Sequence, residues 1–187
     1  MNATQNKSAP SWGALRVGNL LGFAITSMKP VPLDIQPTPL QGFVTFFDPG
    51  WSILRLREAV ANKGTILYPQ TWYDDEPFAL LEEPPRYRQL RMTAVPDSLD
   101  KTFTEQQALV PADEEIPSAR VVIMGMVIHF LANGERLFPD SYVRCADKTS
   151  DVFRVRVGDF DSYGFFVDYY WDDVRYSVLG LTAARKF

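Results

Sequence analysis

The chain has 187 residues, of which 46% are hydrophobic and 22% are charged, and it carries one His and one Cys. This length and composition predict one globular domain, or at most two small ones, and exclude a disordered chain. The single Cys excludes a disulfide framework within the chain and a Cys-rich zinc module, and the single His excludes motifs with two His ligands. We therefore expect no metal ion and no cofactor.

The net charge of −4 is concentrated in the middle of the chain, because residues 73–118 carry eleven acidic and only four basic side chains. A nucleic-acid-binding protein needs a basic face that releases the counterions of the phosphate backbone, so this distribution argues against that function. No apolar run reaches the roughly 18 residues that a membrane-spanning helix requires. A lone Cys without a signal peptide is typical of a cytoplasmic protein, and we expect that location.

The N-terminal part of the chain divides into stretches of different composition. Residues 1–11 are polar and lack periodicity, so we expect them to be disordered, with residues 12–187 forming a single globular α+β domain. The stretch 12–28 is largely apolar apart from Arg16, which indicates a buried helix or a pair of strands. Residues 29–41 contain four prolines and are expected to be extended and irregular.

A strand, a helix and a second strand are predicted within residues 42–68. Residues 42–47 are rich in β-formers and predict the first strand. Asp48 is expected to cap a helix in which Pro49 is the first residue and which ends near Asn62. Residues 65–68 then predict the second strand, so the unit could form a crossover connection.

The segment 69–118 is rich in turn residues and predicts only short elements. A helix over 77–83, a strand over 87–93 and a helix from near Ser98 to Leu109 are expected here. The acidic stretch 111–117 reads as a loop, because prolines stand at both of its ends.

The C-terminal half predicts one buried helix and a sheet. Residues 118–133 are apolar on every side, with Ser118 at the start and Asn133-Gly134 as the stop, which indicates a central buried helix. Alternating side chains separated by turn residues predict an antiparallel meander packed on that helix, hence the α+β class. The four expected strands are 141–146, 152–160, 163–171 and 175–183.

The acidic middle of the chain and its aromatic side chains predict a binding surface. Trp72 and Tyr73 stand directly before three acidic residues, and Trp and Tyr are favoured at interface hot spots. An acidic surface attracts a basic protein partner. We therefore expect a non-enzymatic interaction module, comparable to a small inhibitor or immunity protein, with its oligomeric state left open. The predicted contact residues are Trp72, Tyr73, Asp74, Asp75, Glu76, Glu114 and Glu115.

A small hydrolase or a sugar-binding protein is the alternative, although the chain matches no catalytic motif. Glycoside hydrolysis uses paired carboxylates, often beside aromatic rings, and clustered carboxylates can also hold a hard cation. This alternative site would consist of Asp159, Asp161, Asp172, Asp173 and His129. His129 lies within the apolar helix, so a buried imidazole with one hydrogen bond is the simpler interpretation of that residue.

Overall fold

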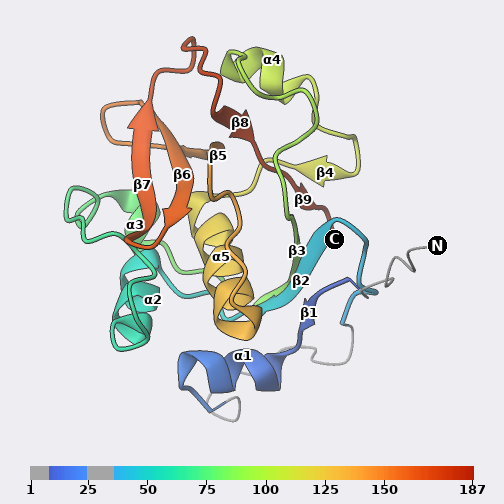
Figure 1. Cartoon of the computed structure of the whole chain (residues 1–187), viewed down its shortest axis with the longest axis vertical. Helices are drawn as coiled ribbons and strands as arrows, with labels where there is room; N and C mark the ends of the chain where they lie inside the picture. Colours follow the sequence, from blue (N-terminus) through green and yellow to red (C-terminus); the bar gives the residue numbers. More distant parts are fainter. Residues whose placement is uncertain (1–8, 25–35) are drawn as a thin grey trace.

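The computed structural model describes residues 9–24 and 36–187, and it arranges them as two β-sheets on either side of helix α5 (Figure 1). Helix α5 spans Ala119–Asn133. It packs against β2 (Phe43–Asp48) of the first sheet and against β5 (Tyr142–Lys148) and β6 (Arg154–Asp161) of the second. The predicted α+β class, with a central buried helix, is confirmed. Of the stretch 1–11 that was predicted to be disordered, residues 1–8 lie outside the described residues, whereas Ser11 forms part of strand β1.

The first sheet has the strand order β1-β2-β3-β9-β4 among the described residues. Its long pair is β2 with β3, which run antiparallel along their whole length, while β1 lies parallel to β2. The two-residue strands β4 and β9 pair with each other, so the predicted loop 111–117 contains a short strand. The strands are β1 (Ser11–Trp12), β2 (Phe43–Asp48), β3 (Arg86–Arg91), β4 (Glu114–Glu115) and β9 (Ala184–Arg185).

The second sheet has the order β7-β6-β5-β8, so the first three strands form the predicted antiparallel meander. The fourth strand differs from the expected meander, because β8 pairs in parallel with β5 at the opposite edge. The buried guanidinium of Arg144 contacts the connection that leads to β8, since it donates to the carbonyls of Trp171 and Val174 at 3.1 and 2.7 Å. The strands are β5 (Tyr142–Lys148), β6 (Arg154–Asp161), β7 (Gly164–Tyr170) and β8 (Leu179–Leu181).

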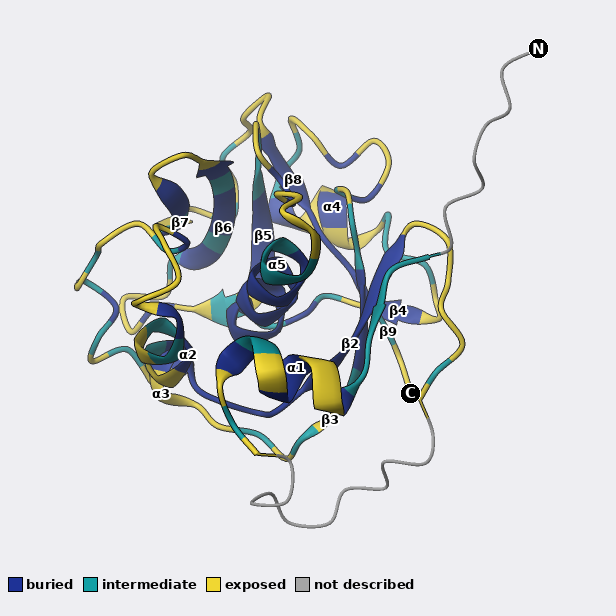
Figure 2. Cartoon of the chain, turned by 60° about the horizontal axis from the view of Figure 1, so that its bottom comes forward, coloured by how far each residue is buried: buried dark blue, intermediate teal, exposed yellow. Residues whose placement is uncertain are grey.

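Helix α5 begins and ends where the sequence predicts. The Ser118 hydroxyl accepts from the amide of Val121, and Gly134 stands in the left-handed conformation with φ 77°. Every residue from Ala119 to His129 is buried (Figure 2), because the helix is covered by a sheet on two sides and by neighbouring helices. A helix that is apolar on all faces is stable only in such a position.

The remaining helices are short: α1, α2 and α3 contact α5, whereas α4 packs against β8. Helix α2 packs beside α5 and begins at Ile53, with Ser52 as its N-cap, so the expectation that Asp48 caps it is wrong. The predicted second strand of this unit is reduced to a single parallel bridge from Leu67 to Phe165 of the other sheet. The helices are α1 (Ala14–Leu21), α2 (Ile53–Val60), α3 (Pro77–Leu80) and α4 (Phe103–Gln107).

Asp48 belongs instead to a buried ionic cluster that joins both long strands of the first sheet to α5. Its two carboxylate oxygens accept from the guanidinium of Arg120 at 2.9 Å each, and one of them also accepts from Arg88 at 3.3 Å. Glu83 pairs with the same two arginines. Asp48, Arg88 and Arg120 are each less than 10% exposed, so two buried cations are balanced by two carboxylates. Charge balance of this kind is required because an unpaired buried charge is strongly destabilising.

Candidate functional site

Four aromatic rings form a continuous row at one end of the second sheet. The ring centroids of Trp72 and Tyr169 are 4.9 Å apart, those of Tyr169 and Phe153 5.1 Å, and those of Phe153 and Trp171 4.3 Å. Trp171 is 57% exposed and Tyr169 41%, and Val152 beside them is 65% exposed. We call Trp72, Tyr169, Phe153 and Trp171 the aromatic row. Large apolar side chains exposed side by side mark an interaction surface more often than scattered ones do.

Trp72 is placed in the row by the segment that covers the outer edge of β7. An edge strand presents unpaired backbone groups and needs a cover. Residues 66–72 supply it: Tyr68 donates its amide to the carbonyl of Phe165, and the side chain of Gln70 accepts from the amide of Val167 at 3.1 Å. The indole Nε1 of Trp72 then donates to the carbonyl of Val167 at 3.0 Å. This cover ends at Trp72, which is where the row begins.

The antiparallel register of β6 and β7, with Arg154 opposite Tyr170, places Phe153 beside Trp171, and a contact between two loops links this end of the hairpin to Trp72. The carboxylate of Glu76 accepts from the backbone amide and the hydroxyl of Ser150, both at 2.9 Å. This contact ties the turn before β6 to the loop that carries Trp72. The row is therefore assembled from three chain segments that are far apart in sequence, 72–76, 150–153 and 169–173.

Acidic side chains surround the row, and the nearby cations are already paired. Arg57 binds Asp74 at 2.8 Å, while Lys148 and Arg154 both bind Asp172, at 3.1 and 2.9 Å. Asp75, Asp151 and Asp173 are exposed, and none of them makes an ion pair within the part of the chain that is described. The surface around the row therefore has an excess of negative charge.

The structure divides the predicted acidic–aromatic surface into two parts. Trp72, Asp74, Asp75 and Glu76 lie at the row, with Trp72 half-buried. Tyr73, which was expected to be an exposed anchor, is fully buried, because its ring packs against Trp72 and Phe78.

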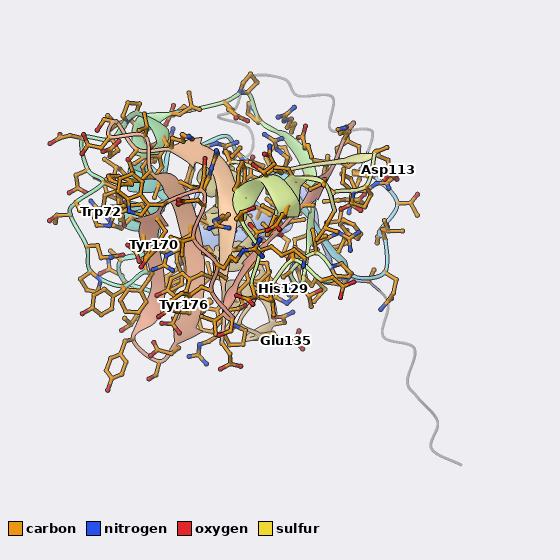
Figure 3. All side chains as sticks on the ribbon, turned by 90° about the horizontal axis from the view of Figure 1, so that it is seen from above. Trp72, Asp113, His129, Glu135, Tyr170 and Tyr176 are labelled. Carbon is orange, nitrogen blue, oxygen red and sulfur yellow. The ribbon has the colours of Figure 1, made fainter. Side chains whose placement is uncertain are left out.

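Glu114 and Glu115 lie far from the aromatic row. Strand β4, which they form, is on the opposite side of the molecule from β7 and α3 in Figure 1. Figure 3 likewise separates Asp113 from Trp72. Glu114 is also buried, where it binds Arg91 through both carboxylate oxygens at 2.6 and 2.7 Å. The expectation that these two residues share a surface with Trp72 is therefore wrong.

The carboxylates of the alternative site do not come together. Asp161 ends β6 and Asp172 follows β7, so the length of the hairpin, roughly 20 Å, separates them. Burial raises the pKa of Asp172, but hydrogen bonds from Arg154 and Lys148 outweigh it and the pKa is lowered. Asp159 accepts from the hydroxyl of Tyr142 at 3.2 Å. Among residues 9–24 and 36–187 no group of three or more acidic, His or Cys side chains could hold a metal ion.

His129 lies apart from these carboxylates, near the C-terminal end of α5. Its side chain is fully buried, and its Nε2 is 3.3 Å from a carboxylate oxygen of Glu135 and 3.3 Å from the side-chain nitrogen Nδ2 of Asn133. Burial lowers the pKa of His129, and Glu135 acts in the opposite direction. The simpler interpretation of His129 as a buried core imidazole is confirmed, with Glu135 as a partner that the sequence analysis did not identify.

Phe153, Tyr169 and Trp171 were predicted only as parts of strands. The available signal was that aromatic residues stand at the ends of two neighbouring strands, where side chains are half-exposed. Their contact with Trp72 depends on the hydrogen bond between Trp72 and Val167, which are 95 residues apart, and no local sequence pattern predicts such a contact.

Comparison with known proteins yields no relative, since no family model, no curated protein and no solved structure matches the chain. None of the helices in the described residues is long and apolar enough to cross a membrane. The candidate function therefore rests on the geometry and charge of the surface itself.

Proposed function

We propose that this protein is an interaction module that binds a basic segment of a protein partner at the aromatic row. The observation that carries the proposal is the continuous line of four rings, partly exposed and bordered by acids without cationic partners. Arg and Lys side chains bind both features, since a cation is attracted to a ring face and to a carboxylate. Trp and Tyr are also the side chains that most often dominate the energy of an interface.

Other features of the chain agree with a cytoplasmic binding protein. Its one Cys, Cys145, is free and buried, which suits a reducing compartment. Burial raises the pKa of the Cys145 thiol well above its ordinary value, so a nucleophilic role at neutral pH is disfavoured. The acids that a hydrolase would need as a close pair are instead separated or bound to arginines.

The first test measures peptide binding to the wild-type protein by fluorescence polarisation. The probe is a short labelled peptide in which Arg and Leu alternate, and peptides with Gln or Glu in place of Arg are its controls. We expect the Arg peptide to bind and the Glu peptide not to bind. Equal binding of the Gln and Arg peptides would contradict a site that selects basic segments.

Variants of the aromatic row locate the binding. Trp171→Ala should weaken binding of the Arg peptide by roughly tenfold or more, as expected for a hot-spot ring. Tyr163→Ala is the matched control, because Tyr163 is 68% exposed but lies in the hairpin at the other end of β7. If both variants bind as the wild type does, the row is not the site. Melting curves verify that each variant is folded.

Charge variants test whether binding of the Arg peptide depends on the acids beside the aromatic row or only on the net charge of the chain. Asp75, Asp151 and Asp173 are changed together to Asn, and the control changes Glu58, Glu115 and Asp140 to Gln, Gln and Asn. We expect only the first set to weaken binding of the Arg peptide. Equal weakening by both sets would mean that non-specific attraction explains the result. If neutral oligosaccharides change the intrinsic Trp fluorescence and the Arg peptide does not, the sugar-binding alternative replaces this proposal.

A further inference from the structure

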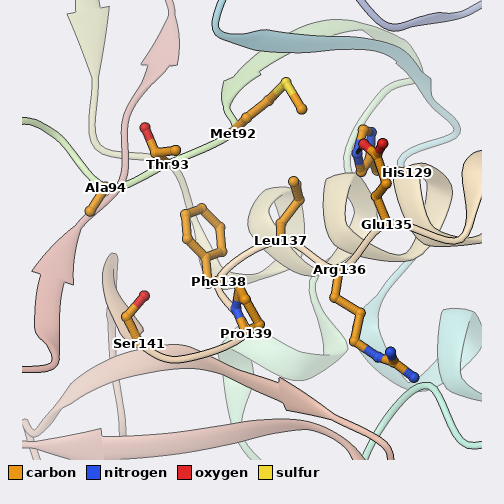
Figure 4. Close-up of a pocket in the computed structure, with 10 residues that line it drawn as sticks. All are labelled: Met92, Thr93, Ala94, His129, Glu135, Arg136, Leu137, Phe138, Pro139 and Ser141. Carbon is orange, nitrogen blue, oxygen red and sulfur yellow. Dashed lines mark hydrogen bonds and ion pairs between the residues drawn. The ribbon is translucent and has the colours of Figure 1, made fainter.

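Two adjoining cavities, both open to solvent, lie beside the C-terminal end of α5, away from the aromatic row. One has a volume of about 520 Å³ and the other of about 870 Å³, and both are bordered by Met92 and Glu135. Figure 4 shows the first cavity, with His129 and Glu135 together at one end and Leu137 and Phe138 facing the segment Met92–Ala94. Volumes of several hundred cubic ångströms are typical of small-molecule sites.

Glu135 supplies the negative charge at the junction of the two cavities. Its side chain is 57% exposed, and it pairs with no Lys or Arg in the described part of the chain. The backbone of Glu135 is held in place, because its amide donates to the side-chain oxygen of Asn133 at 2.9 Å and it follows Gly134 in the left-handed conformation. The neighbouring Arg136 stacks on the rings of Phe130 and Phe160, at 5.2 and 5.5 Å, instead of pairing with the carboxylate. The Glu135 carboxylate is therefore open to a cation from outside the protein.

The buried polar groups behind this carboxylate are incompletely satisfied. The Nδ1 of the fully buried His129 has no hydrogen-bond partner among the described residues, and neither has the indole nitrogen of Trp12, which borders the larger cavity. Unsatisfied buried polar atoms are uncommon in folded proteins, and a bound water molecule or ligand is one explanation for them. Phe138 adds a second unusual feature, since it lines the smaller cavity with a positive φ of 55°. A non-glycine residue in this region is held there only by its surroundings.

The walls of the cavities are mainly apolar. Leu137 and Phe138 are 3% exposed each, and Met92, Pro139 and Trp12 complete the apolar lining. A ligand that fits this site combines an apolar body with one positive charge. The apolar body would lie against this lining, and the charge would meet Glu135.

We propose that these cavities form a binding site for a small organic cation, namely an amine with an apolar body whose ammonium group binds the Glu135 carboxylate. This inference is independent of the aromatic row, because the two sites share no residue. The NMR signals of the His129 ring should change when an amine occupies the site, since the Nε2 of His129 already contacts the Glu135 carboxylate.

The test uses the only imidazole of the chain as a probe. NMR spectra of the His129 ring are recorded while phenethylamine is added, with 2-phenylethanol as the uncharged control and 3-phenylpropionate as the control of opposite charge. We expect saturable shifts with phenethylamine and affinities at least about tenfold lower for both controls, because a charged hydrogen bond is much stronger than a neutral one. No saturable shift with phenethylamine, or equal affinities for the amine and the alcohol, would overturn the proposal.

Variants assign the effect to Glu135. Glu135→Gln should lower the affinity for phenethylamine by about tenfold, whereas Glu58→Gln removes an exposed carboxylate on α2 and should leave it unchanged. Trp171→Ala should also leave it unchanged, which distinguishes this site from the aromatic row. If Glu135→Gln binds phenethylamine as tightly as the wild type, or if Glu58→Gln weakens it equally, Glu135 is not the recognition group and the proposal fails.

Discussion

His129 shows how burial and one neighbour set the properties of a single residue. Removal from water disfavours the charged imidazolium and lowers the pKa of His129, while the Glu135 carboxylate 3.3 Å away favours it. Burial has the larger effect, so the folded protein holds His129 neutral at a pH where an unfolded chain would begin to protonate it. This difference links the stability of the fold to pH.

The pKa of His129 is expected to lie below its ordinary value of 6.5 and to fall further in Glu135→Gln, because that variant removes a carboxylate that favours the imidazolium. NMR titration of the single imidazole measures both values directly. A His129 pKa above 6.5, or no change in the Glu135→Gln variant, would contradict this explanation.

The free energy of unfolding should depend on pH because the pKa of His129 is lowered in the folded protein. As the pH falls below about 6.5, the unfolded chain takes up a proton on His129 that the folded protein does not, so the free energy of unfolding decreases down to the folded pKa. We expect the wild type to lose more stability than His129→Gln between about pH 7 and pH 5.5, measured by urea unfolding. Identical losses would show that His129 does not contribute.

Helix α5 shows how closely the elements of this fold approach one another. A methyl group at Gly125 would lie 2.7 Å from Cδ2 of Leu90 on β3 and 3.1 Å from a ring carbon of Phe46 on β2. Both neighbours are fully buried and have little room to move. The absence of a side chain at Gly125 therefore sets the distance between the helix and the first sheet.

Gly125→Ala is expected to destabilise the protein by up to about 2 kcal/mol, because overpacking a core costs about 1–3 kcal/mol and the roughly 1 kcal/mol that Ala gains over Gly in a helix offsets only part of it. Urea unfolding of this variant, of Leu90→Val and of the double variant forms a cycle. We expect the double variant to lose less free energy of unfolding than the two single variants lose together, since Leu90→Val removes bulk at the contact. A Gly125→Ala variant that is more stable than the wild type would show that the helix can move away from the sheet.

The ionic cluster around Asp48 connects elements from distant parts of the whole molecule. It joins the end of β2, strand β3, the segment at Glu83 and the first turn of α5. The cluster lies at the junction of elements that are distant in sequence, so its formation requires the complete fold. Replacing one acid leaves two buried arginines with a single carboxylate.

Asp48→Asn is expected to lower the free energy of unfolding by about 3–5 kcal/mol, the cost of leaving a buried charge without its partner. Asp74→Asn is the control, because it breaks the partly exposed pair with Arg57 and should cost no more than about 1 kcal/mol. Chemical denaturation compares the two. Equal losses would mean that the cluster around Asp48 is no more important than a surface pair.

Features of the fold with local causes were predictable from the sequence. The bounds of α5 follow from Ser118, Gly134 and the apolar run between them, and the strands β5, β6 and β7 follow from alternating side chains and turn residues. These signals act over a few residues, because capping, left-handed glycine and side-chain alternation are properties of neighbouring backbone groups.

Features that depend on distant contacts were decided only by the tertiary structure. The parallel pairing of β8 with β5 joins strands about 37 residues apart in the sequence, and the role of Asp48 depends on two arginines from other elements. Trp72 and its acidic neighbours are surface candidates from their composition alone. The burial of Tyr73 and Glu114 and the contacts that join Trp72 to Phe153, Tyr169 and Trp171 arise from packing. Burial and long-range pairing depend on the complete set of contacts, and therefore no single stretch of sequence specifies them.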